Sequence, residues 1–171
     1  DQIGGLLLGV NAGDEPDGPL PARGLGVVLG PTLPGRFAYG APSVMIVGEP
    51  YFLSVTIAAL TSGETTPQLD LRLAQDTRES LGADSPASIR PGDVMLSSNM
   101  SAELTGDGFE ITELTEARQS VDLKGGVTRW LWEVRGTAAG RSSLVMRLTI
   151  AGEGGAPDKL VRVVRSVIDV R

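Results

Sequence analysis

Residues 127–150 constrain the fold more than any other stretch of this chain. They contain two runs in which apolar and polar residues alternate, joined by a short segment bounded by Gly136 and Gly140. Alternation with a period of two indicates a strand with one buried face, and a short glycine-bounded connection between two such runs is typical of a β-hairpin. We therefore expect an all-β fold with a hairpin at its centre. Its predicted core residues are Trp130, Trp132 and Val134 on the first strand and Leu144, Met146 and Leu148 on the second.

Further strands are predicted wherever the alternation recurs, at residues 43–47, 51–60, 68–74, 94–104, 109–112, 121–123 and 159–171. Leu69, Leu71 and Leu73 alternate with polar residues, which predicts that 68–74 pairs with 51–60 in a second hairpin. Residues 75–93 are polar and irregular, and two interpretations stay open there: a short helical turn near residues 77–81, or a crossover between sheets, which is favoured. The alternation slips near Arg165 and Ser166, which predicts a β-bulge.

The first 42 residues differ in composition from the rest, because two short apolar runs alternate with segments rich in glycine and proline. Proline interrupts the hydrogen-bond ladder of a sheet and glycine weakens a strand. We predict that residues 1–42 form an extended arm with one or two short edge strands. At 171 residues the chain is long enough for one domain, which we place at residues 43–171.

Seven to nine short strands separated by turn signals predict two antiparallel sheets packed as a sandwich. The succession Met-x-Ala-x-Leu, Gly-x-Gly-Phe-x-Ile, Trp-x-Trp-x-Val and Leu-x-Met-x-Leu resembles bacterial immunoglobulin-like sandwich domains over residues 43–171. The disulfide pair of antibody-type domains is absent, since the chain has no cysteine. The resemblance implies a spacer, receptor or adhesion module and implies no catalytic residues.

The absence of histidine excludes several classes of function. With no histidine and no cysteine, the chain cannot form Ser-His-Asp or Cys-His catalytic groups, and most zinc sites are excluded. The net charge is −6 and the 15 basic residues are scattered, so a nucleic-acid partner is not expected. No apolar run approaches the roughly 18 residues that span a bilayer. The chain begins at Asp1 rather than Met, so a signal peptide or an anchor would lie outside it.

Two acidic groups are candidate sites, and a solvated surface is the favoured interpretation of each. Closely spaced carboxylates can bind calcium, but the spacing of the first group does not match an EF-hand loop. Paired carboxylates can catalyse glycoside hydrolysis, but nothing places the second group across a cleft. The first group is Asp14, Glu15 and Asp17, and the second is Glu110, Glu113 and Glu116 with Asp107 nearby.

Three further motifs carry little functional weight. Gly24, Gly26 and Gly30 do not complete a dinucleotide-binding fingerprint, because position 29 is leucine and no helix is predicted to follow. Asn99 begins a formal N-glycosylation sequon but lies in a predicted strand. Trp130 and Trp132 could form a flat platform for sugar stacking, although the core interpretation is stronger because Val134 continues the same face.

The sequence therefore predicts a non-catalytic immunoglobulin-like β-sandwich that binds a protein partner or acts as a spacer or sensor in a larger, membrane-anchored bacterial protein. We expect no cofactor, no metal and no membrane insertion within this segment. An extracytoplasmic location, in the periplasm or at the cell surface, is favoured over the cytoplasm. Two alternatives stay open, namely a carbohydrate-binding module that uses Trp130 and Trp132, and a glycoside hydrolase that uses carboxylates alone.

Overall fold

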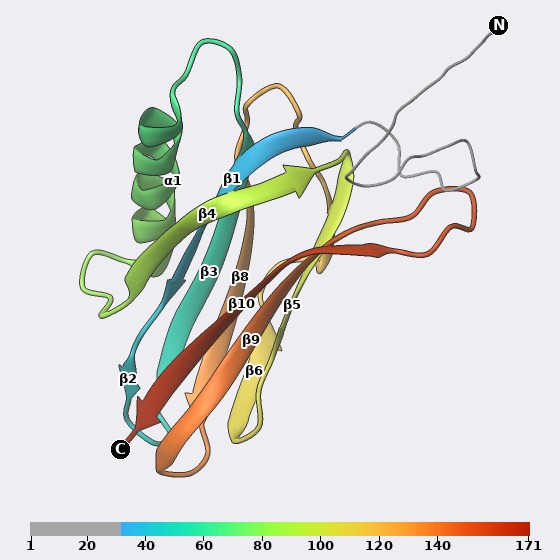
Figure 1. The fold of residues 1–171 in the computed structure, drawn as a ribbon. Helices are drawn as coiled ribbons and strands as arrows, with labels where there is room; N and C mark the ends of the chain where they lie inside the picture. Colours follow the sequence, from blue (N-terminus) through green and yellow to red (C-terminus); the bar gives the residue numbers. More distant parts are fainter. Residues whose placement is uncertain (1–31) are drawn as a thin grey trace, which may run out of the picture.

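The computed structural model describes residues 32–171, which form two five-stranded sheets and one helix (Figure 1). The first sheet has the strand order β4–β1–β3–β8–β6, and the second has the order β2–β10–β9–β5–β7. The strands of the first sheet are β1 (Leu33–Ala41), β3 (Pro50–Ala59), β4 (Ser88–Leu96), β6 (Phe109–Glu113) and β8 (Thr128–Gly136). Those of the second are β2 (Val44–Met45), β5 (Asn99–Thr105), β7 (Arg118–Ser120), β9 (Gly140–Ile150) and β10 (Lys159–Val170). Neighbouring strands are antiparallel except β2 and β10, which are parallel.

The main hydrophobic core lies between the two sheets and takes side chains from both. On β8, Trp130 and Trp132 are 1% and 2% exposed, and Val134 is fully buried beside them. Leu144, Met146 and Leu148 on β9 are also fully buried and belong to the same cluster. The period of two therefore predicts the buried face of both strands correctly, because successive side chains in a strand point to opposite faces.

The connection between these two strands is not the predicted hairpin. β8 pairs with β3 and β6 in the first sheet, whereas β9 pairs with β10 and β5 in the second. Residues 137–139 therefore carry the chain from one sheet to the other. Both runs direct apolar side chains at one shared core from opposite sides, and this arrangement produces the same alternation as a hairpin with one buried face.

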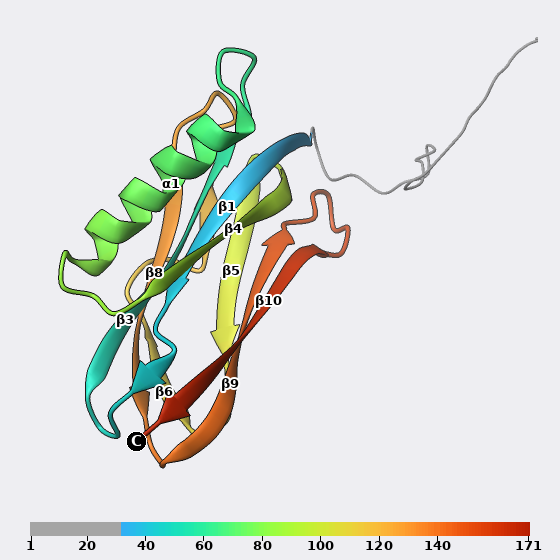
Figure 2. The ribbon, with the colours of Figure 1, turned by 60° about the vertical axis from the view of Figure 1, so that its left-hand side comes forward.

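Residues 68–74 are helical, and the predicted second hairpin is wrong. They belong to α1 (Thr66–Leu81), which covers the outer face of the first sheet (Figure 2). Thr65 and Gln68 form a capping box at its start, and Pro67 lies in the first turn, where a missing N–H costs nothing. The buried residues repeat every four positions, which defines one helical face: Leu69, Leu73, Thr77 and Leu81. Leu71 points away from this face and is 61% exposed.

The predicted boundary at residue 43 also needs correction. β1 is nine residues long and lies between β4 and β3, so it is an interior strand of the first sheet and not part of an arm. It includes Gly35 and Gly40, and glycine within a strand is unfavourable, so the sequence did not predict a strand here. Both glycines sit where neighbouring side chains approach the backbone closely: an added Cβ would lie 2.6 Å from Leu96 at Gly35 and 2.6 Å from Leu81 at Gly40. The rest of the predicted arm, residues 1–31, lies outside the described part of the chain.

Several strand boundaries differ from the predictions. The run at 94–104 divides into the ends of β4 and β5, which belong to different sheets, and the run at 43–47 contains only the two-residue β2. β7 occupies residues just before the predicted strand at 121–123. In β10 the register shifts between Leu160 and Arg162, so the bulge lies near the start of the strand and not at Arg165.

Candidate interaction surface

One edge of β10 has no strand beside it along most of its length. β9 pairs with one side of β10 throughout, but β2 pairs with the other side only at Asp169 and Val170. Between Lys159 and Ile168, no strand among residues 32–171 pairs with that side. We call this stretch the free edge of β10. An unpaired edge presents backbone N–H and C=O groups that can pair with another chain.

The direction of the backbone groups on the free edge follows from the hydrogen bonds at its end. The Asp169 N–H donates to the Ser43 carbonyl at 2.9 Å, and the Arg171 N–H donates to the Met45 carbonyl at 2.8 Å. Successive residues of a strand direct their backbone N–H and C=O groups to opposite sides. Counting back from Asp169 by twos, the groups that point to the free edge are those of Val163, Arg165 and Val167. The Arg165 carbonyl accepts a hydrogen bond of 2.7 Å from Arg90 Nη2 on β4, which agrees with this direction.

Apolar side chains follow the same strand on its outer face. Leu160, Val163 and Val167 are 51%, 47% and 48% exposed. Arg165 lies between the two valines and is also exposed. The combination of free backbone groups with exposed valines is typical of a surface that another polypeptide covers.

Two hollows flank the free edge on the side of β1 and β4. One, of about 310 Å³, is bounded by Pro34, Asp93, Met95, Val161 and Arg162, with Gly35 and Val94. The other, of about 290 Å³, is bounded by Tyr39, Ser88, Arg90, Ser166 and Val167, among others. Asp93 of β4 lines the first hollow, and Arg90 of β4 lines the second. The two hollows together form an uneven groove between β4 and β10.

An arginine side chain lines each hollow of this groove, Arg162 the first and Arg90 the second. Arg162 lies over the ring of Phe37 at 5.2 Å and forms an ion pair of 3.5 Å with Asp93. Arg90 reaches the Arg165 carbonyl and makes no ion pair with a carboxylate in the described residues. The groove is consequently basic, although the chain as a whole carries a net charge of −6.

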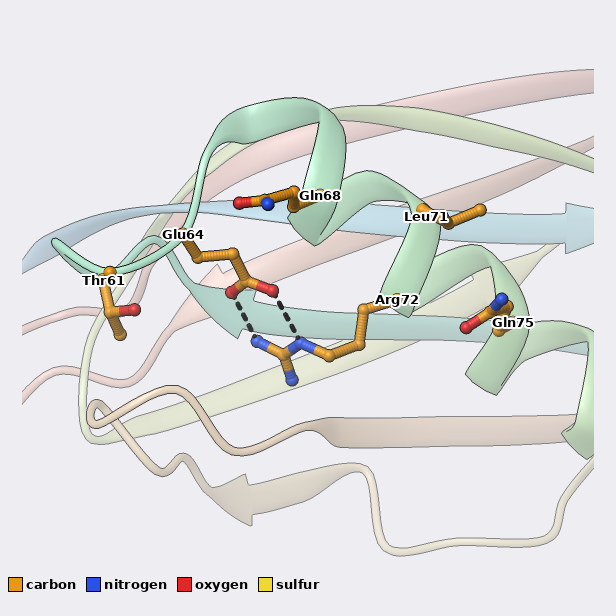
Figure 3. A pocket seen from close by; sticks show the side chains of 7 residues that line it. Thr61, Glu64, Gln68, Leu71, Arg72 and Gln75 are labelled. Carbon is orange, nitrogen blue, oxygen red and sulfur yellow. Dashed lines mark hydrogen bonds and ion pairs between the residues drawn. The ribbon is translucent and has the colours of Figure 1, made fainter.

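A larger hollow, of about 570 Å³, lies at the start of α1 (Figure 3). Its charged groups are Glu64 and Arg72, which are joined by two hydrogen bonds of 3.0 and 2.8 Å. Arg72 Nη1 also donates to the Gly125 carbonyl at 3.1 Å. The bonds from Arg72 hold the pKa of Glu64 below its usual value, and the same contact raises the pKa of Arg72. Both groups are fully engaged in fixing the loop to the helix, so this hollow offers a ligand few free polar groups.

The structure does not bring the second acidic group together. Glu110 and Glu113 are three residues apart on β6, so they point to opposite faces of that strand. Glu116 lies in the loop that follows, and Asp107 in the turn before β6. Within residues 32–171, no group of three acidic side chains is placed to hold a metal ion. The first acidic group, at positions 14, 15 and 17, and the glycines at 24, 26 and 30 lie outside the described residues.

Of the remaining predicted sites, the two tryptophans are buried and the sequon asparagine is exposed. Trp130 and Trp132 lie in the core, and Trp130 Nε1 donates to the Ala117 carbonyl at 2.8 Å, so neither ring presents a face to a sugar. Asn99 is exposed at the start of β5. Sequence reasoning missed the free edge of β10, because an edge is defined by pairing and not by local pattern.

No protein-family model, no curated protein and no solved structure matches this chain. The described part of the chain contains no helix that is both long enough and apolar enough to cross a bilayer.

Proposed function

We propose that this chain is a non-catalytic β-sandwich module of the immunoglobulin-like kind that binds a partner protein through the β10 side of the molecule. The observation that carries this proposal is the free edge of β10 together with the exposed Val163 and Val167. Two sheets that share one core support the sandwich, and the similarity of the strand pattern to bacterial immunoglobulin-like domains supports a place in a larger extracytoplasmic protein.

The other edges of the two sheets are less suited to this role. β6 and β7 are only five and three residues long, and β4 carries Pro91 in its middle. Short edge strands and edge prolines are devices that prevent strand addition. The free edge of β10 is long and contains no proline, so it is the edge most able to accept another polypeptide.

The proposal can be tested by photo-crosslinking in the cells that make the protein. A benzophenone amino acid is placed at Val163, at Val167, or at Leu71 as a control that is at least as exposed but lies on α1. We expect adducts of one common mass at both β10 positions and none at Leu71. Equal labelling at all three positions, or no adduct at the two valines, would contradict the proposal.

A further inference from the structure

The geometry of the groove points to a specific kind of partner segment. We propose that the free edge of β10 accepts an extended segment of a partner protein in which two small apolar residues are four positions apart with an acidic residue midway between them. This inference rests on the proposed function and adds the mode of binding and the chemistry of the segment.

The backbone groups of β10 favour addition of a strand. Val163, Arg165 and Val167 direct their N–H groups to the free edge, and β2 already pairs with this side further along, at Asp169 and Val170. A segment that lies in line with β2 would extend the second sheet by main-chain hydrogen bonds, which supply affinity without requiring a particular sequence. Arg90 now donates to the Arg165 carbonyl, and an incoming N–H group would replace that donor.

The two hollows define which side chains the segment carries. Along β10 they are bounded by Val161 and Arg162 at one end and by Ser166 and Val167 at the other. These positions are four to six residues apart, or roughly 13–20 Å in a strand. Residues four apart on a partner strand point to the same face and are separated by about 13 Å, so one can enter each hollow. The hollows measure about 310 and 290 Å³ and are open to solvent, so each has room for a side chain such as valine.

The residue between these two points to the same face and lies between Arg162, which lines one hollow, and Arg90, which lines the other. Arg90 has no carboxylate partner in the described residues, and Arg162 has one, Asp93, at 3.5 Å. Lys159 at the start of β10 likewise makes no ion pair within residues 32–171. An acidic side chain at the middle position would therefore face unpaired positive charge, and a basic one would be repelled.

Hydrogen exchange of the full chain, followed by NMR, tests the proposal. The ligand is a capped synthetic heptapeptide, Thr-Val-Thr-Glu-Thr-Val-Thr, and its control has Lys in place of Glu. At saturation we expect the amides of Val163, Arg165 and Val167 to exchange at least tenfold more slowly. The amides of the intervening residues already donate to β9 and should not change. The lysine peptide should bind on the order of tenfold more weakly, because one attraction becomes a repulsion.

Two variants make the test specific. Arg165→Pro removes an N–H group that faces the free edge and leaves the bonds to β9 intact, so the chain should fold and lose peptide binding. Arg90→Glu reverses the charge of the groove and should invert the preference between the two peptides. Arg147→Ala on β9 is the matched control, since it removes a cation from the outer face of the sheet without altering the edge, and it should bind within twofold of the parent chain.

Other occupants of the edge would overturn the proposal in recognisable ways. Edge amides that are protected without peptide, with protection that falls on dilution, would show that a second copy pairs there. Protection that disappears when residues 1–31 are removed would show that the chain covers its own edge. If neither peptide binds while crosslinking at Val163 and Val167 persists, strand addition is wrong but the interaction module is not. If both fail, the proposed function is wrong as well.

Discussion

Gly40 lies on β1 beneath the last turn of α1, and one added methyl group there measures how closely the helix packs on the sheet. An alanine Cβ would lie 2.6 Å from Leu81 Cδ1 and 3.0 Å from Thr77 Cγ2. Leu81 is 6% exposed and Thr77 is fully buried, so neither side chain can move freely away. Overpacking of this kind typically costs about 1–3 kcal/mol. Replacing glycine also restricts the unfolded chain, which offsets about 0.4–1 kcal/mol. We therefore expect Gly40→Ala to lower the free energy of unfolding by about 1–2 kcal/mol.

Urea melts followed by tryptophan fluorescence measure this change. With an m value of about 2 kcal/mol/M, the midpoint should fall by about 0.5–1 M at constant m. Gly63→Ala is the matched control, because a Cβ at Gly63 meets nothing within 4 Å. Only the restriction of the unfolded chain then remains, so the midpoint of this variant should stay level or rise by up to about 0.5 M.

The same reasoning predicts coupling between Gly40 and Leu81. Leu81→Ala alone should cost about 2–5 kcal/mol, as for other buried leucines. In the double variant the new methyl group occupies part of the space that Leu81 leaves. The double variant should therefore lose at least about 0.5 kcal/mol less stability than the sum of the losses in the two single variants. Strict additivity, or a Gly40→Ala variant as stable as the parent, would refute the close packing of α1 on β1.

Three further predictions concern the core, the pH dependence and metals. Trp130→Ala and Trp132→Ala should each cost about 3–5 kcal/mol in urea melts, and free quenching of both rings by acrylamide would contradict this. Burial raises the pKa of Tyr39, and the hydrogen bond with Ser166 offsets only part of this rise. The unfolded chain therefore loses this proton first, so stability should fall as the pH rises above about 10. Tyr39→Phe should weaken that fall, and identical alkaline profiles for the two chains would argue against it. EDTA should leave the melting temperature unchanged, and a large decrease would reveal a metal site.

The alternation of apolar residues predicted buried faces well and strand partners poorly. A period of two depends only on which face of a strand is buried, so the inward faces of β8 and β9 followed directly from the sequence. The partner of each strand depends on where distant segments lie. β8 and β9 are neighbours in the sequence but belong to opposite sheets, and no local pattern separates that arrangement from a hairpin.

The errors at α1 and β1 have different causes. Leu69, Leu71 and Leu73 alternate over a short window, but the wider spacing of Leu69, Leu73 and Leu81 fits a helix, and Thr65 with Gln68 supplies a capping signal. β1 contains glycine where α1 and β4 approach its backbone, so its composition resembles that of a loop. The first error could have been avoided from the sequence, whereas the second required the positions of residues more than 40 places away.

The free edge of β10 is best understood by comparing it with the other edges of the two sheets. Natural proteins prevent unwanted strand addition by short edge strands, by proline and by charge. β6 and β7 are short, and β4 carries Pro91. β10 has the bulge near Leu160 and the charge of Arg162 and Arg165, but neither feature prevents strand addition along the whole free edge. A bulge prevents pairing only where it lies, and positive charge repels only segments that are not acidic. The protection on this edge is therefore selective, and it admits the class of segment that the two hollows and Arg90, which has no carboxylate partner within residues 32–171, would bind.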